Sequence, residues 1–233
     1  MKFIHSLNLS PEQTIQETEG AMLLKFIRLL KLSPGQKILD VGCGYGRSLK
    51  LLRSKGFEVF GVEINQDIVD ANNQAGLACM SDSQFKQTDD LYDVLLLMHV
   101  IEHFTPEALV GFMDHYLDRL RPGGHLIIAT PLLTASFFDD FDHLKPYHPT
   151  GIQMVFGRGK AQVQYYARNT LELVDIWFRR GPFVLRFFSG IYVGKHNSRL
   201  LLMINKLSTL LFRMSFGMLG KPNGWMGLYR KVL

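Results

Sequence analysis

The chain has 233 residues, enough for one sizeable domain, and 47% of them are hydrophobic, an ordinary share for a globular core. Its two cysteines, Cys43 and Cys79, exclude a disulfide framework or a cysteine-rich metal site and favour a reducing compartment. The first dozen residues contain no continuous apolar run of the kind found in a secretory signal, so we expect a cytoplasmic protein.

The net charge of +5 at pH 7 is unevenly distributed along the chain. Residues 1–175 carry sixteen Lys or Arg and twenty-one Asp or Glu, whereas residues 176–233 carry ten basic residues and no acidic one. A basic segment on an acidic body is expected at an anionic membrane surface or on nucleic acid. The sequence has no N-P-P-[YFW] tetrapeptide and no recognised RNA-binding motif, which argues against nucleic acid.

Two helices are predicted in an N-terminal helical cover, residues 1–35. Ser10 and Pro11 suit the cap and the first turn of one helix, and residues 20–32 place apolar side chains along one face of a second. Two roles remain open for this cover: it protects a sheet edge, or it also closes over a ligand.

The stretch ILDVGCGYGRS, residues 38–48, predicts a buried strand, a tight loop and the start of a helix. Its three glycines are Gly42, Gly44 and Gly46. Such a loop lets a ligand lie against backbone N–H groups and a helix N-terminus. A dinucleotide fingerprint requires glycine where this chain has Arg47, and it lacks an acidic residue at the position of Asp40, so the spacing argues against NAD.

The pattern D-x-G-x-G-x-G, from Asp40 to Gly46, resembles the first motif of class I S-adenosylmethionine-dependent methyltransferases. The cofactor of that family presents an ammonium and a carboxylate instead of a pyrophosphate, and an acidic residue suits the ammonium. The resemblance is close over residues 36–131, the expected cofactor-binding core. It implies an α/β fold with a doubly wound, mostly parallel, seven-stranded Rossmann-like sheet and an antiparallel last strand, in one methyltransferase domain spanning residues 1–233.

The order of apolar runs agrees with that architecture. Strands are expected from residue 37 into Asp40 and at residues 57–64, 76–80, 92–98 and 125–131, with the last two at 171–178 and 225–232. The resemblance implies that Glu63, at the tip of the second strand, accepts ribose hydroxyls, and that Asp82 and Ser83 contact the adenine. The other expected cofactor contacts are Cys43, Ile64, Met98 and His99.

A general base is expected after the fourth strand, where HVIEHF brings His99, Glu102 and His103 within five residues. We interpret His103 and Glu102 as catalytic, although His103 at a helix start also fits a capping role. The string H-x-x-E-H is similar to the E-x-x-E-H of quinone O-methyltransferases, for which a divalent cation has been proposed. Imidazole at position 99 suits Zn or Fe better than Mg, and we predict no metal.

A second group of polar residues lies in FFDDFDHLKPYHP, residues 137–149, within an expected substrate loop at 132–160. It is similar to the D-P-T-H-x-R-P-[YF] stretch of methyltransferases from bacterial polysaccharide and lipopolysaccharide gene clusters. The matching residues are Asp140, His143, Pro146 and Tyr147, and the departures are Phe141, Asp142 and Lys145. His143 is therefore a second candidate base, and the alternative is an ordinary polar loop.

The basic C-terminal part, residues 176–233, contains a predicted amphipathic helix at 198–219. Arg199, Lys206 and Arg213 recur every seven residues on one stripe, and apolar side chains fill the opposite face. Two interpretations stay open: the helix lies in an anionic membrane surface, or it packs its apolar face on the protein's own sheet.

These features predict an S-adenosylmethionine-dependent methyltransferase, with O-methylation of a lipid-linked or cell-surface glycan as the first hypothesis. A quinone-type O-methyltransferase is the alternative, and a non-catalytic cofactor-binding module that docks on a membrane is the third. The basic end favours a cytoplasmic protein located peripherally on the inner face of the membrane.

Overall fold

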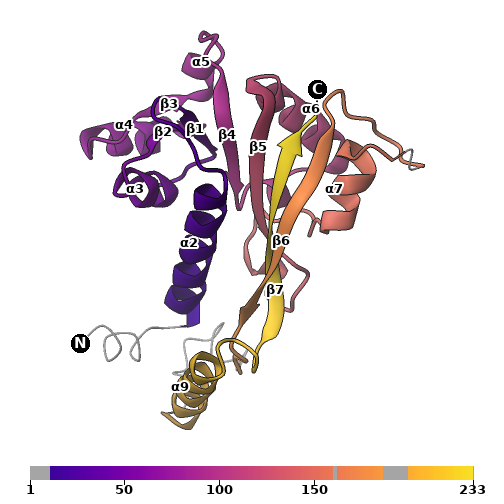
Figure 1. The fold of residues 1–233 in the computed structure, drawn as a ribbon. Helices are drawn as coiled ribbons and strands as arrows, with labels where there is room; N and C mark the ends of the chain where they lie inside the picture. Colours follow the sequence, from indigo (N-terminus) through magenta and orange to yellow (C-terminus); the bar gives the residue numbers. More distant parts are fainter. Residues whose placement is uncertain (1–10, 160–161, 186–198, 233) are drawn as a thin grey trace. The chain divides into compact units, whose positions relative to one another are not determined.

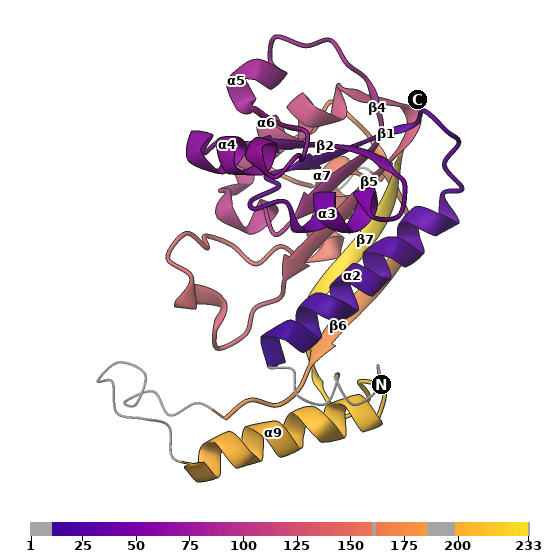
Figure 2. The ribbon, with the colours of Figure 1, turned by 90° about the vertical axis from the view of Figure 1, so that its left-hand side faces the viewer.

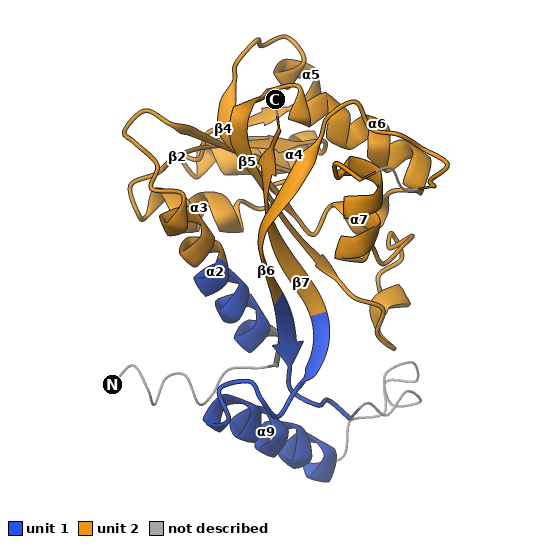
Figure 3. Cartoon of the chain, turned by 45° about the vertical axis from the view of Figure 1, so that its right-hand side comes forward, with its two compact units in different colours: residues 1–22, 178–223 blue, residues 23–177, 224–233 orange. Residues whose placement is uncertain are grey.

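The computed structural model describes residues 11–159, 162–185 and 199–232 (Figure 1). The chain divides into two compact units, coloured in Figure 3. The small unit takes in residues 1–22 and 178–223, and the large unit takes in residues 23–177 and 224–233. The single methyltransferase domain expected for residues 1–233 stays a prediction.

Seven strands form one sheet in the order β3-β2-β1-β4-β5-β7-β6 (Figure 1). They are β1 (Lys37–Val41), β2 (Glu58–Glu63), β3 (Cys79–Ser81), β4 (Tyr92–Met98), β5 (Leu120–Pro131), β6 (Leu171–Gly181) and β7 (Lys221–Lys231). The pairs β1–β2, β1–β4, β2–β3 and β4–β5 are parallel, whereas β7 pairs antiparallel with β5. The predicted fold class, with its antiparallel last strand, is confirmed.

The helices lie between the strands in the expected alternation. They are α2 (Pro11–Leu29), α3 (Arg47–Arg53), α4 (Gln66–Gln74), α5 (Asp82–Phe85), α6 (Pro106–Leu117), α7 (Pro149–Phe156) and α9 (Arg199–Met214), with short 3₁₀ turns η1 (Ile101–His103) and η2 (Phe137–Asp139). Thr105 caps α6 through a hydrogen bond from the Ala108 N–H, as the Thr-Pro-Glu start predicts.

One continuous helix, α2, occupies the region where two helices were predicted, so the boundary placed at Gly20 is wrong. Glycine inside a helix costs about 1 kcal/mol relative to alanine. Leu23, Phe26 and Ile27, in the next turns, are at most 1% exposed. Burying such side chains stabilises the helix by about 2 kcal/mol each, which outweighs the cost of the glycine.

Both faces of the central strands are covered. Leu39 and Leu95, paired across β1 and β4, pack in a core cluster with side chains of α6 such as Met113. Their strand neighbours Ile38 and Leu96 point to the opposite face and are equally buried. A parallel sheet buried on both faces leaves the loops at its strand ends as the place for a ligand.

A substrate loop was predicted at 132–160, of which the structure describes residues 132–159. This part follows β5 as an irregular segment that carries η2 (Figure 2). Its second half is not loop, because α7 begins at Pro149 and the exposed His148 caps it by accepting the Thr150 N–H. Helix α7 was not predicted, although the sequence carries its signal, a capping side chain followed by proline at the first helical position.

The small unit has its own polar core. Arg179 forms a buried ion pair with Glu19 and donates two hydrogen bonds to Asn223. Arg213 on α9 pairs with Glu17 at 3.2 Å. These contacts join the start of α2, the end of β6, the start of β7 and α9, which lie far apart in the sequence.

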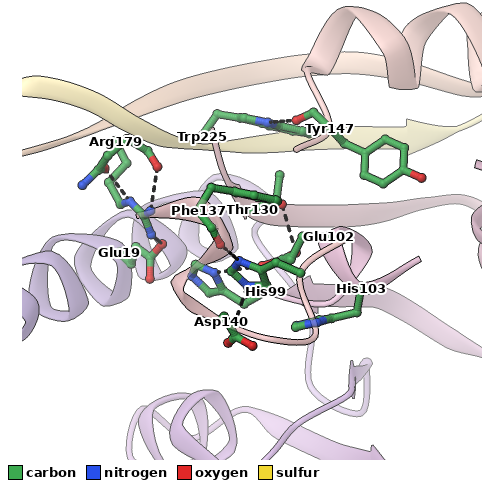
Figure 4. Close-up of polar contacts among 12 residues, drawn as sticks. Glu19, His99, Glu102, His103, Thr130, Phe137, Asp140, Tyr147, Arg179 and Trp225 are labelled. Carbon is green, nitrogen blue, oxygen red and sulfur yellow. Dashed lines mark hydrogen bonds and ion pairs between the residues drawn. The ribbon is translucent and has the colours of Figure 1, made fainter. Parts of the chain in front are cut away.

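We expect Trp225→Phe to destabilise the large unit. Trp225 is 1% exposed, and its indole N–H donates to the Tyr147 carbonyl at 2.8 Å (Figure 4). Phenylalanine leaves that carbonyl buried without this donor, so the free energy of unfolding should fall by about 1–3 kcal/mol. Urea unfolding followed by circular dichroism measures the change. Trp177→Phe, at a partly buried position on β6, is the matched control, and an equal loss in both variants would contradict this account.

Candidate active site

The carboxyl ends of the parallel strands meet at one edge of the sheet. In register, Val41 of β1 lies beside Val62 of β2 and Leu97 of β4, and Leu97 lies beside Ile128 of β5. The residues that follow these positions therefore gather at one edge, which we call the carboxyl edge.

The glycine loop between β1 and α3 is too tight for side chains at two positions. Gly42 and Gly46 have φ of 67° and 71°, in the left-handed region that glycine adopts without strain. A Cβ atom on Gly42 would lie 2.8 Å from Val100, and one on Gly46 would lie 2.6 Å from Leu77. The loop is thus packed closely against the protein at Gly42 and Gly46, whereas a Cβ on Gly44 would meet nothing within 4 Å.

Glu63, at the tip of β2, shapes this loop. Its carboxylate accepts the N–H of Gly44 at 3.0 Å, of Ile64 at 2.9 Å and of Asn65 at 3.1 Å. A carboxylate offers about four acceptor positions, so capacity remains for a ligand hydroxyl. Ile64, directly after it, is 87% exposed and presents an apolar surface at the same edge.

Asp40, near the end of β1, is a buried carboxyl group with an orphaned oxygen. It is 1% exposed, and no hydrogen bond reaches its Oδ1 within the described part of the chain. Burial raises the pKa of Asp40 to about 7, although Arg47 and the Ser48 hydroxyl act to lower it. A buried, unsatisfied carboxylate oxygen next to a glycine loop fits the ammonium of an amino-acid ligand.

Cys43 turns its side chain away from the loop surface. Its Sγ lies 3.5 Å from the Sγ of Cys79, and both cysteines are buried. Only the backbone of Cys43 is therefore placed to face a ligand.

Asn72 of α4, which was not predicted from the sequence, donates to the Gly44 carbonyl at 2.7 Å. The signal for it is a buried polar residue on the apolar side of a short helix, three residues after Val69.

The expected adenine contacts lie at the N-terminus of α5, beside the tip of β2, because Glu63 pairs in register with Ser81. Asp82 accepts a hydrogen bond from the Tyr116 hydroxyl at 3.3 Å and pairs with Lys86. Ser83 lies 2.8 Å from the Ser81 hydroxyl, Oγ to Oγ. These contacts place both side chains at the carboxyl edge, where their role toward adenine stays a prediction.

The end of β4 is strained where it enters the expected catalytic stretch. After Met98, His99 has φ of 61°, which is uncommon for a residue other than glycine and recurs at functional sites. Its N–H donates to the Ala129 carbonyl at 2.7 Å, and its Nδ1 lies 3.3 Å from Glu102 Oε1 (Figure 4).

Glu102 connects three segments at this point. Its side chain is fully buried and accepts the Thr130 hydroxyl at 2.9 Å (Figure 4). Its main-chain carbonyl accepts the N–H groups of Leu144 at 2.9 Å and Lys145 at 3.1 Å. The end of β5 and the 132–148 segment are therefore attached to η1 through one residue, which gives Glu102 a positioning role.

His103 and His143 lie together, with ring centroids 5.0 Å apart. Nδ1 of His103 is 3.1 Å from the Asp142 carbonyl oxygen, and Nδ1 of His143 is 2.6 Å from that of Phe137. A carbonyl oxygen only accepts, so each Nδ1 carries the hydrogen, and each neutral ring keeps its lone pair on Nε2. Both predicted bases are therefore held in the tautomer that accepts a proton or binds a metal at Nε2.

The same residues form a candidate metal-binding group. Ligand atoms of Glu102, His103 and His143 lie within 4.8 Å of one another. The string H-x-x-E-H suggested His99 as the third member, and in the structure His143 takes that place. Two imidazoles and one carboxylate suit Zn or Fe better than Mg. That no metal is needed stays a prediction.

Tyr147 has a structural place in this segment. It is 8% exposed, and its hydroxyl donates to the Phe104 carbonyl at 2.9 Å. Tyr147 is therefore held by contacts within the protein. Phe138 and Phe141, at 64% and 98% exposed, are the rings of this segment that face outward.

The fold is Rossmann-like, and the glycine loop at its carboxyl edge leaves open space over Gly44 where a small cofactor would fit. A family model described as "Methyltransferase domain" matches residues 16–176. The chain belongs to this family, the class I S-adenosylmethionine-dependent methyltransferases, and its cofactor is S-adenosylmethionine. The orphaned oxygen of Asp40 and the open surface over Gly44 fit that cofactor.

The relatives differ in their acceptors. A ubiquinone biosynthesis O-methyltransferase of Rickettsia bellii is 32% identical over 105 residues, 40% of this chain and 41% of the relative. Phosphoethanolamine N-methyltransferase 1 of Zea mays is 28% identical over 122 residues, 48% of this chain and 24% of the relative. The chain thus spans less than half the length of these relatives.

Among solved structures, an S-adenosylmethionine-dependent methyltransferase from Archaeoglobus fulgidus has the same fold. Its TM-score is 0.57 with 20% sequence identity, and the match covers 98% of both chains. At that identity the likeness establishes the fold alone.

Asp40→Asn should weaken cofactor binding and yet stabilise the protein at pH 8. The pKa of Asp40 rises from 3.8 to about 7 on folding, so the folded protein holds this proton more tightly than the unfolded chain does. The free energy of unfolding therefore falls as the pH increases from about 4 to about 7. Asparagine carries no buried charge, so we expect the free energy of unfolding to rise by up to a few kcal/mol at pH 8 and to change little at pH 4.

Affinity for S-adenosylmethionine should fall about tenfold or more in Asp40→Asn, since a charge-assisted contact is lost. Calorimetric titration and urea unfolding measure the two effects. Asp70→Asn, on the exposed side of α4, is the control. Unchanged affinity in Asp40→Asn would remove Asp40 from the cofactor site.

Proposed function

We propose that this chain transfers the methyl group of S-adenosylmethionine to an oxygen atom of its acceptor, with His103 or His143 as the base. The observation that carries the proposal is the pair of imidazoles at the carboxyl edge, each with Nδ1 facing a carbonyl oxygen. A hydroxyl acceptor must lose its proton as the new bond forms, and imidazole takes up a proton near neutral pH.

The bound cofactor supplies an electrophilic methyl group. Asp40 and the glycine loop would hold its amino-acid part, and Glu63 would hold its ribose. His103 or His143 would take the acceptor's proton at Nε2. Asp140 Oδ2 lies 3.7 Å from Nε2 of His143 and would stabilise the imidazolium that results. Much of the acceleration would come from holding acceptor and methyl donor close and aligned.

For the acceptor, we favour a hydroxyl of a lipid-linked or cell-surface glycan. The support is the similarity of residues 140–147 to glycan-cluster methyltransferases, together with the exposed rings of Phe138 and Phe141, which suit stacking on a sugar ring. A cytoplasmic enzyme peripheral to the inner face of the membrane would meet such an acceptor.

A quinone-type ring is the second candidate. It is favoured by the ubiquinone O-methyltransferase relative and by the metal-capable group of Glu102, His103 and His143. In this case a bound cation would lower the pKa of the acceptor hydroxyl, and the proton would pass to water instead of to an imidazole. The same three residues cannot act as ligands and as free bases at once, which makes the two candidates separable.

We expect at least one of the variants His143→Ala and His103→Ala to reduce methyl transfer while cofactor binding stays unchanged. Loss of a general base lowers the rate about a hundredfold or more. The assay follows labelled methyl groups from S-adenosylmethionine into lipid-linked sugars and into hydroxylated quinone precursors. His148→Asn is the matched control, because His148 is an exposed histidine of the same segment and asparagine can keep its capping hydrogen bond to α7. Wild-type rates in both test variants would rule out histidine base catalysis.

A chelator separates the two acceptor classes. If His103 and His143 act as free bases, activity on the glycan survives dialysis against a chelator. If a cation is required, the chelator abolishes activity and added Zn²⁺ or Fe²⁺ restores it. Cation-dependent transfer to quinone precursors, without transfer to lipid-linked sugars, would replace the glycan hypothesis by the quinone one.

A further inference from the structure

The amphipathic helix α9 presents its polar side to its own unit. Asn205 accepts the Leu185 N–H at 2.8 Å and donates to the Leu185 carbonyl at 2.9 Å. The Ser208 hydroxyl donates to the Phe183 carbonyl at 2.7 Å. Thr209, in the next position, is 5% exposed. Within the small unit, the helix is thus held by these polar groups together with the buried ring of Phe212.

The apolar side of α9 is exposed as a consequence. At about 100° per residue, six apolar side chains fall on one stripe about 100° wide, which we call the α9 stripe. Its members, between 39% and 68% exposed, are Leu200, Met203, Ile204, Leu207, Leu211 and Met214. Within the small unit, the helix therefore packs through its polar side and not through this face.

Exposed apolar side chains continue beyond the helix. Phe216 is 96% exposed, and Met218 and Leu219 are also more than half exposed. Such an accumulation on one short segment marks an interaction surface, because soluble proteins seldom expose so many large apolar side chains together.

The charges next to the α9 stripe identify the partner. Arg199 and Lys206 are exposed on one flank of the stripe, and residues 176–233 contain ten basic residues and no acidic one. A second copy of the helix would bring basic flanks together with no carboxylate from this segment to pair with them. An anionic phospholipid surface accepts both the apolar side chains and the positive charge.

No helix among the described residues is both long and apolar enough to cross a membrane. We propose that the α9 stripe inserts into the interfacial layer of a membrane containing anionic phospholipid, with Arg199 and Lys206 at the headgroups. This docking does not depend on which acceptor the enzyme methylates.

The test is co-sedimentation of the full chain with vesicles of phosphatidylcholine alone or mixed with phosphatidylglycerol. The wild type should bind the mixed vesicles and bind neutral ones weakly. Leu207→Gln should weaken binding about tenfold, since a side chain inserted into lipid is lost. Leu202→Gln is the matched control: Leu202 is 48% exposed, like Leu207 at 55%, but lies off the stripe, and its replacement should change binding little.

Two charge-reversal variants test the electrostatic part of the proposal. Lys206→Glu should reduce binding to anionic vesicles about tenfold, whereas Lys55→Glu, the same change at an exposed site in the large unit, should have a smaller effect. Equal binding to neutral and anionic vesicles, or equal effects of Leu207→Gln and Leu202→Gln, would overturn the proposal. A second outcome would also overturn it: the wild type does not bind vesicles, and light scattering shows that it forms a dimer which Leu207→Gln dissociates.

Thermal unfolding and S-adenosylmethionine binding, measured on each variant, monitor folding and the catalytic site. A variant that binds cofactor but not vesicles has lost membrane docking alone. A wild-type protein that does not bind S-adenosylmethionine would count against the proposed function and would leave the docking result unchanged.

Discussion

The parallel register of β1, β2, β4 and β5 is the constraint on which the candidate site depends. It places Asp40 and the glycine loop, Glu63, the strained His99 and Thr130 at one edge of a sheet whose faces are both buried. Antiparallel pairing would send alternate strand ends to opposite edges. The candidate cofactor contacts and candidate bases come from distant parts of the sequence and meet because four strands end together.

Much of the fold follows from the sequence, because alternating apolar runs and helix signals are local. The D-x-G-x-G-x-G pattern indicated the methyltransferase family, and strands β1, β2 and β4 lie within one residue of their predicted positions. A helix boundary was predicted at Gly20, but α2 continues through it because the low helix propensity of one glycine is outweighed by burial of the following turns. Asn72 and Thr130 were missed because their roles depend on partners far away in the sequence.

In the candidate site, too, the local signals were predictable and the long-range contacts were not. The sequence indicated His103 and His143 separately, each from its own motif. Only the fold shows that their ring centroids lie 5.0 Å apart and that each Nδ1 faces a carbonyl oxygen. For α9, periodicity identified an apolar stripe but not which side of the helix would be covered. The hydrogen bonds of Asn205 and Ser208 decide that point, and they leave the stripe exposed.

The most direct test of the account is a crystal structure of the protein with S-adenosylhomocysteine. We predict that the ligand lies over Gly44, with its amine at Oδ1 of Asp40 and its ribose hydroxyls at Glu63. Its sulfur should point toward His103 and His143. A ligand bound elsewhere, or one whose sulfur faces away from both histidines, would contradict the assignment of the carboxyl edge as the site of methyl transfer.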